Sequence, residues 1–150
     1  IGAGTSSVAI EAARIACSGH VYAIEKNSEA VRLIYENKLK FQLPNLHIVH
    51  GVAPEALEGL PMPTHAFIGG SSGNLKDIVD RLYSMNKNVS VVINAITLET
   101  LGEALAAVKT HVAAYEITGV NISKNKQAGS YNIMTALNPV YIISCKPQTN

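Results

Sequence analysis

The chain begins with Ile-Gly-Ala-Gly-Thr-Ser-Ser, "IGAGTSS", at residues 1–7, and this stretch decides how the rest is interpreted. A turn bracketed by two glycines is typical of the point where a β-strand ends and a helix begins. Glycine allows a tight turn there and a close approach of the backbone to a ligand. A residue among positions 5–7 can cap a helix that runs towards Gly19. We expect the strand that such a loop follows to lie upstream of Ile1, in an N-terminal part that precedes this sequence.

Apolar runs of strand length alternate with helical segments over the first two thirds of the chain. The strands that we expect are residues 20–24, 46–49, 65–68 and 89–93. Helices are expected between them, at about 28–43, 74–82 and 97–112, with at most a short helix at 54–57. Such alternation is typical of a doubly wound, mostly parallel α/β sheet.

The last third breaks this alternation. Residues 115–122 and 131–145 have strand character, and the polar stretch 123–130 between them is expected to be a loop. A parallel pair needs a longer crossover, so these strands are predicted to form an antiparallel hairpin at the C-terminal end of the sheet. Nothing in the sequence suggests a linker or repeat, and we predict one domain over residues 1–150.

Composition argues against some functions. The 150 residues carry a net charge of +1, which provides no strong field for nucleic acid or a membrane surface. No apolar run approaches the ~18 residues of a membrane span. Cys17 and Cys145 are expected to be buried, reduced thiols of a cytoplasmic protein. We expect no metal, because His47 and His50 are three positions apart on a strand and therefore point to opposite faces.

Glu25 is the most informative charged residue. It lies 21 positions after Gly4, at the end of the second expected strand. Nucleotide-binding folds place an acidic residue about 20 positions beyond the glycine loop, where it accepts the ribose hydroxyls. The sixth position of the dinucleotide fingerprint requires Gly or Ala, and here it is Ser7. The pattern therefore predicts adenosine binding and favours S-adenosylmethionine, which has no pyrophosphate, over NAD.

Six stretches, in order, resemble the decarboxylating precorrin methyltransferases of cobalamin biosynthesis, a family that includes the CbiT-type proteins. They are "GAGTSSVAIEAA", "GHVYAIEKN", "APEALEGLP", "AFIGGSSGNL", "VVINAITLETL" and "NPVYIIS". The resemblance implies a Rossmann-like class I methyltransferase fold with seven strands and S-adenosylmethionine as cofactor. It implies methylation of carbon 15 of a precorrin or cobalt-precorrin, coupled to decarboxylation of the ring C acetate. It also implies a homotetramer, with a fused or separate carbon-5 methyltransferase as partner.

The resemblance also assigns site residues by position. The cofactor-binding residues would be Gly2, Ala3, Gly4, Thr5, Glu25, Lys26, Val52, Ala53 and Gly69. The residues bordering the reacting methyl group would be Gly70, Ser71 and Asn94. For the tetrapyrrole, with its many carboxylates, we expect contacts from Ser71, Ser72, Thr97, Lys124, Lys126 and Tyr131. No single residue is identified as the catalyst.

Two positions depart from the family pattern. Ser6 stands where the family usually has Gly, and Val52 where it commonly has Asp. Val52 cannot accept a hydrogen bond from an adenine amine, and one such bond contributes about 0.5–1.5 kcal/mol. We therefore expect weaker cofactor binding. The alternatives left open are another class I methyltransferase, for example one acting on tRNA, a catalytically impaired binding module, and a nicotinamide dehydrogenase.

Overall fold

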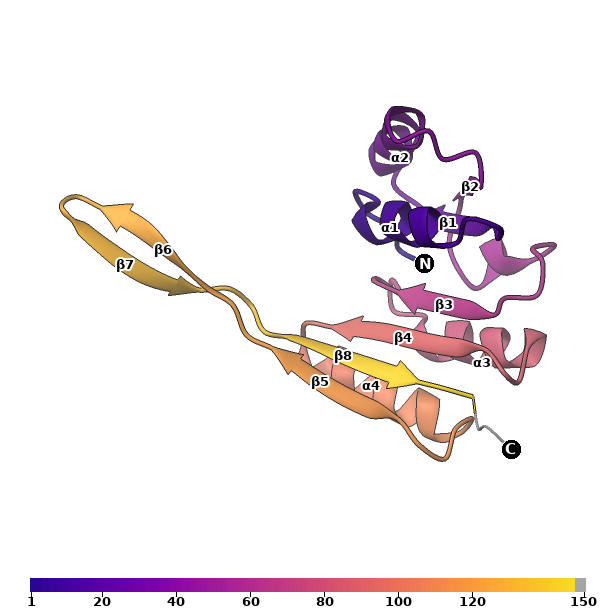
Figure 1. Cartoon of the computed structure of the whole chain (residues 1–150). Coiled ribbons are helices and arrows are strands. Elements are labelled where there is room, and N and C mark those ends of the chain that lie inside the picture. Colours follow the sequence, from indigo (N-terminus) through magenta and orange to yellow (C-terminus); the bar gives the residue numbers. More distant parts are fainter. Residues whose placement is uncertain (148–150) are drawn as a thin grey trace.

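The structure, a computed structural model, describes residues 1–147 and consists of an α/β body with a long β-ribbon that projects from it (Figure 1). The helices are α1 (Ser7–Ile15), α2 (Ser28–Lys40), the 3-10 helix η1 (Glu55–Leu57), α3 (Leu75–Met85) and α4 (Leu98–Lys109). The strands are β1 (Val21–Glu25), β2 (Leu46–His50), β3 (His65–Ile68), β4 (Ser90–Ala95), β5 (Glu116–Val120), β6 (Ser123–Ala128), β7 (Tyr131–Ala136) and β8 (Val140–Cys145).

The start of the chain joins two groups of strands. β1 pairs with β2 in parallel, and β3 and β4 form a second parallel pair that β8 and β5 extend in antiparallel order. Between β1 and β3, the Ile1 amine donates to Phe67 O at 2.7 Å, and Gly69 N donates to Ile1 O at 2.9 Å. On the other side, Gly2 N and Ala3 N donate to Ile24 O at 3.0 and 3.1 Å. The expected doubly wound arrangement is present, while the strand expected before Ile1 stays a prediction.

Two apolar clusters hold the helices against the strands. α3 and α4 pack against each other, and α4 contacts β4 and β8. Four α3 residues spaced for one helix face, Leu75, Ile78, Val79 and Leu82, are at most 1% exposed in this larger cluster. A smaller cluster around Ile34 and Leu46 packs α1 and α2 against β1 and β2. The loops that follow β1, β2 and β3 are thereby set at one edge of the body.

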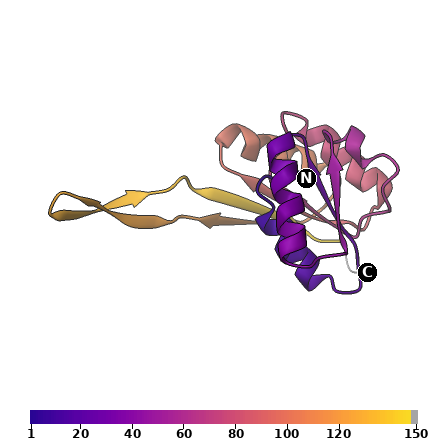
Figure 2. The same cartoon turned by 90° about the horizontal axis from the view of Figure 1, so that it is seen from above.

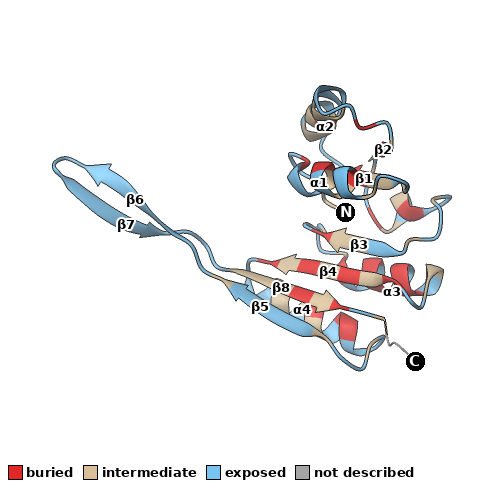
Figure 3. Cartoon of the chain, in the orientation of Figure 1, coloured by how far each residue is buried: buried red, intermediate tan, exposed pale blue. Residues whose placement is uncertain are grey.

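The prediction of a loop at residues 123–130 is wrong, because residues 123–128 form the strand β6. This strand pairs with β7 in a two-stranded antiparallel ribbon, which we call the arm (residues 123–136). Every residue of both strands is exposed, and the arm extends away from the helices (Figures 2 and 3). A ribbon with both faces in solvent has no buried side to impose apolar alternation, so the periodicity test could not detect β6.

The two cysteines differ in environment. Cys145 on β8 is 1% exposed, as expected, whereas Cys17 is exposed and the prediction of a buried thiol there is wrong. Cys17 lies in the turn after α1, beyond the last residue that the helix packs against the strands. Within residues 1–147, no helix is long and apolar enough to cross a membrane.

Candidate cofactor and active site

Four chain segments meet in one cleft at the carboxyl edge of the parallel strands. They are the start of the chain, the end of β1, the turn after β2 and the glycine-serine loop after β3, and one residue of α3, Ile78, completes the lining. The residues lining the cleft are Ile1, Gly2, Ile24, Glu25, Lys26, Gly51, Val52, Ala53, Gly70, Ser71, Ser72 and Ile78. Its volume is about 190 Å³. Pockets that enclose whole drug-sized ligands span roughly 300–1,000 Å³, so a nucleoside ligand would lie partly in an open groove.

Gly2 brings two loops into direct backbone contact. Its φ of +65° is in the left-handed region, and a Cβ there would lie 2.5 Å from Gly70 O and 2.7 Å from Gly70 N. Only glycine fits this position without moving one of the loops. At this point the two loops meet backbone to backbone, which fixes the position of the glycine loop in the cleft.

Glu25 is a carboxylate held in place by backbone donors. Gly4 N donates to Glu25 Oε2 at 2.8 Å, Asn27 N donates to Oε1 at 2.9 Å, and the residue is 8% exposed. Burial raises the pKa of this carboxyl, but the N–H groups of Asn27 and Gly4 outweigh burial, so the pKa lies below its ordinary value. A carboxylate offers about four lone-pair sites, so backbone donors such as Gly4 N and Asn27 N leave part of its capacity for hydroxyl donors from a ligand.

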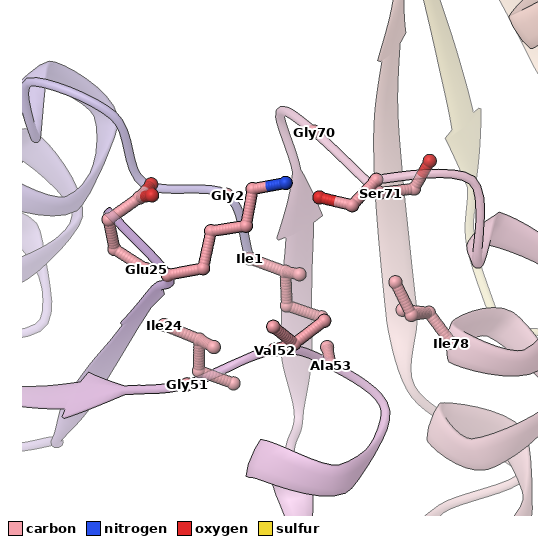
Figure 4. A pocket seen from close by; sticks show the side chains of 12 residues that line it. Ile1, Gly2, Ile24, Glu25, Gly51, Val52, Ala53, Gly70, Ser71 and Ile78 are labelled. Carbon is pink, nitrogen blue, oxygen red and sulfur yellow. The ribbon is translucent and has the colours of Figure 1, made fainter. Parts of the chain in front are cut away.

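The other walls of the cleft are mostly apolar. Figure 4 shows Glu25 and Ser71 on opposite sides, with Val52 and Ala53 between the strands beneath them. Val52 is 41% exposed and Ala53 only 4%, so the Val52 side chain is open to a flat apolar group. One buried carboxylate and two serines in an apolar cleft suit a ligand with a diol at one end and an aromatic base at the other.

The structure places eight of the predicted residues in the lining. These are Gly2, Glu25, Lys26, Val52, Ala53, Gly70, Ser71 and Ser72. Sequence reasoning missed four lining residues, Ile1, Ile24, Gly51 and Ile78. Gly51 follows β2 directly and could have been found by its place at a strand end, whereas Ile78 has only the helical spacing of a core residue.

Several predicted residues are not part of the cleft lining. Gly4 acts through its bond to Glu25, and Gly69 N donates to Ile1 O. Asn94, at the carboxyl end of β4, has a buried Oδ1 that accepts no hydrogen bond within residues 1–147. Thr97 is the N-cap of α4, where its Oγ1 accepts from Thr100 N at 3.1 Å. Of the other two predicted loop residues, Ala3 is partly buried and Thr5 is exposed.

Three predicted substrate residues are on the arm rather than in the cleft. Lys124 pairs with Thr135 and Lys126 with Ile133, so both lysines lie on the face that also carries Tyr131. Tyr131 is 74% exposed and Ile133 is 53% exposed. The arm leaves the body from the ends of β5 and β8, at the edge where β4 also ends (Figure 1).

Ser6 does not face the cleft. Its side chain is fully buried, and its hydroxyl accepts a hydrogen bond from Asn37 Nδ2 on α2 at 3.1 Å. The side chain that Ser6 adds to the loop therefore points away from the cleft. As to metal ligands, His20 and His47 contact each other at 3.1 Å, and the described chain brings together no group of three potential ligands.

Known proteins resemble this chain over nearly its whole length. A family model described as the precorrin methyltransferase domain matches residues 1–146. The probable cobalt-precorrin-6B C(15)-methyltransferase (decarboxylating) of Pyrobaculum calidifontis is 37% identical over 146 residues, which cover 96% of this chain and 75% of the relative. The crystal structure of precorrin-6y C5,15-methyltransferase from Geobacter metallireducens matches with a TM-score of 0.86 and 39% identity, covering 96% of this chain and 75% of that one.

A more distant likeness extends the fold assignment. A SAM-dependent O-methyltransferase from Thermotoga maritima matches with a TM-score of 0.72 at 16% identity, covering 99% of this chain and 58% of that one. At this identity the likeness shows the fold alone. The expected Rossmann-like methyltransferase fold is confirmed by these neighbours.

Proposed function

The chain belongs to the precorrin methyltransferase family, and on that premise we propose how its cleft works. The protein is a decarboxylating methyltransferase of cobalamin biosynthesis. Its reaction is methylation of carbon 15 of a precorrin or cobalt-precorrin with loss of carbon dioxide from the ring C acetate. The observation that carries the proposal is Glu25, whose buried carboxylate lines the cleft and is held in place by the N–H groups of Gly4 and Asn27.

S-adenosylmethionine fits the residues present and, when bound, supplies an electrophilic methyl group. Glu25 would hold the two ribose hydroxyls, and the Gly2 loop would hold the methionine part. The turn at Val52 and Ala53 would contact the adenine. The role of this chain in catalysis is alignment and exclusion of water, since an electron-rich ring carbon needs no further activation to attack such a methyl group.

The loop after β3 and the end of β4 would bound the reacting centre. Gly70 and Ser71 line the cleft opposite Glu25. Asn94, which we expect near the reacting methyl group, has a buried side-chain oxygen without a partner in the described chain. The electron pair released by decarboxylation would enter the conjugated ring, while these groups hold the ring in line with the methyl group.

The test uses the purified chain with labelled S-adenosylmethionine and the reduced precorrin, with and without cobalt. We expect a mass gain of one methyl group together with loss of carbon dioxide. Methylation without decarboxylation would contradict half of the proposal. If the chain binds S-adenosylmethionine but neither methylates nor decarboxylates the precorrin, the methyl acceptor is a different molecule.

The arm supports a proposal about assembly. An isolated two-stranded ribbon is at best marginally stable in water, and this one exposes Tyr131, Ile133 and Met134 by 53–74%. We propose a cytoplasmic homotetramer in which arms of different subunits pack on one another, with a carbon-5 methyltransferase as a fused or separate partner. Light scattering after size exclusion should give a tetramer for the wild type and smaller species when these three residues are changed to Ser. A monomeric wild type would contradict it.

The same arm would contact the substrate. Lys124 and Lys126 share one face of the ribbon with Tyr131, so two cations stand beside a flat apolar ring. The tetrapyrrole has matching chemistry, a flat macrocycle with carboxylate side chains. Within the tetramer, this face would meet the carboxylates of a substrate whose reacting carbon lies at a cleft.

A further inference from the structure

Ser6 and Asn37 form a buried contact immediately behind the glycine loop. Ser6 is 0% exposed, has a φ of +77°, and is the N-cap of α1 without making a side-chain capping bond. Asn37 Nδ2, on α2, donates to Ser6 Oγ at 3.1 Å and to Thr5 O at 3.3 Å. One amide therefore holds two consecutive residues at the point where the loop becomes a helix.

This contact answers two requirements of the local backbone. A residue with a Cβ is disfavoured at positive φ, so Ser6 needs compensating interactions to stay there. A buried hydroxyl also needs a hydrogen-bond partner, and Asn37 provides it. The Ser6 side chain, at the position where the family usually has glycine, is thus hydrogen-bonded to α2 through Asn37.

Residues at both ends of α2 bond to parts of the site: Glu25 at its start and the end of the glycine loop near its C-terminus. At its start, Asn27 caps the helix by accepting from Ala30 N, and its own N–H donates to Glu25 Oε1. Three turns later, Asn37 reaches the loop that begins at Gly2. Because a helix is stiff over this length, it fixes the distance between Glu25 and the end of the glycine loop.

We propose that Asn37 is a positioning residue for the cofactor loop and that Ser6 is its dedicated partner. The inference rests on the proposed function, since it concerns the loop that would hold the methionine part of S-adenosylmethionine. It reverses the expectation from sequence: replacing Ser6 by the family's usual glycine lowers cofactor affinity, because the bond to Asn37 is lost.

The experiment is calorimetric titration of the full chain with S-adenosylhomocysteine, combined with steady-state kinetics and denaturant unfolding. We expect Asn37→Ala to raise Kd roughly tenfold, and Ser6→Ala and Ser6→Gly to raise it several-fold, as for loss of one or two hydrogen bonds. KM for S-adenosylmethionine should rise with Kd, while kcat at saturation stays unchanged. The double variant Asn37→Ala with Ser6→Ala should bind no worse than Asn37→Ala alone, since both remove the same contact.

Asn45 offers a matched control at the other end of α1. Its Nδ2 donates to Ala13 O and Ala16 O, both at 2.9 Å, and it touches nothing in the cleft. Asn45→Ala should lower stability without changing Kd. If Asn37→Ala, or Ser6→Ala where the former fails to fold, likewise leaves Kd unchanged, the positioning role is overturned while the proposed function stands. A wild type that binds neither S-adenosylmethionine nor its product would overturn both.

Discussion

The cleft and the arm both begin at the carboxyl edge of the sheet, yet their backbones are held in different ways. In the cleft, loops far apart in sequence bond to one another, as Gly4 does to Glu25 and Gly69 to Ile1. The arm has only its own ladder, in which β6 and β7 pair with each other and all side chains are exposed. The cleft is thus specified by contacts within one chain, whereas the arm exposes the surface that the proposed tetramer would bury.

The largest effect should come from Gly2→Ala. The added Cβ would meet Gly70 O at 2.5 Å, so one of the two loops must move out of place. We expect S-adenosylmethionine affinity to fall by about 100-fold, equivalent to ~2.7 kcal/mol, measured by calorimetry.

Gly59→Ala is the matched control for this change. Gly59 has a φ of +72° with nothing within 4 Å of a built Cβ, so it isolates the conformational cost of about 1–2 kcal/mol from the clash. It should lower the free energy of unfolding by that amount and leave affinity unchanged. Equal affinities for the two variants would mean that the contact between the loops does not shape the site.

Glu25→Gln should have the next largest effect. The amide replaces one acceptor oxygen with a donor that faces the N–H group of Gly4 or Asn27. Hydrogen bonds to a charged group contribute about 1.5–3 kcal/mol, so we expect Kd to rise roughly 10- to 100-fold. Glu58→Gln removes an equal charge from an exposed position and should leave Kd unchanged. An unaltered Kd for Glu25→Gln would exclude the ribose role.

Glu25 also predicts a pH dependence of stability. Its pKa in the folded chain lies below the ordinary value of 4.5, so its stabilising contribution is complete above that pH. The contribution is lost as the pH falls through the lowered pKa. Urea unfolding between pH 6 and pH 3 should therefore show a smaller loss of stability for Glu25→Gln than for the wild type. Parallel curves would contradict the lowered pKa.

The same contrast explains what sequence could predict. Gly4 and Glu25 were identifiable because a turn and an acid at fixed spacing reflect local geometry and strand order. β6 was not, because its alternation of lysine with amides has no buried face to mark it. The contact of Ser6 with Asn37 could not be predicted either, since it joins two residues 31 positions apart through one side-chain amide. The position of Val52 after β2 was enough to place it at the cleft, but the exposure of its side chain could not be predicted from the sequence.

A smaller effect is expected from the lysines of the arm. Changing Lys124 and Lys126 together to Gln should raise KM for the tetrapyrrole several-fold, because exposed ion pairs contribute about 0–1 kcal/mol each. The difference from the wild type should shrink at high salt. Lys87→Gln with Lys109→Gln provides a control of equal charge outside the arm. A KM that responds equally to both pairs would show that net charge, and not the arm, attracts the substrate.

The smallest effect should come from Thr97, which sequence assigned to the substrate and the structure uses as a helix cap. Thr97→Ala removes the acceptor for Thr100 N and should cost about 1 kcal/mol of stability, as N-cap losses typically do. Thr97→Ser keeps the hydroxyl and should retain most of it. If KM for the tetrapyrrole stays the same in both variants while only the alanine variant is less stable, Thr97 acts as a helix cap and does not contact the substrate. A rise in KM shared by both variants would instead show that its methyl group contacts the substrate and extend the cleft to the start of α4.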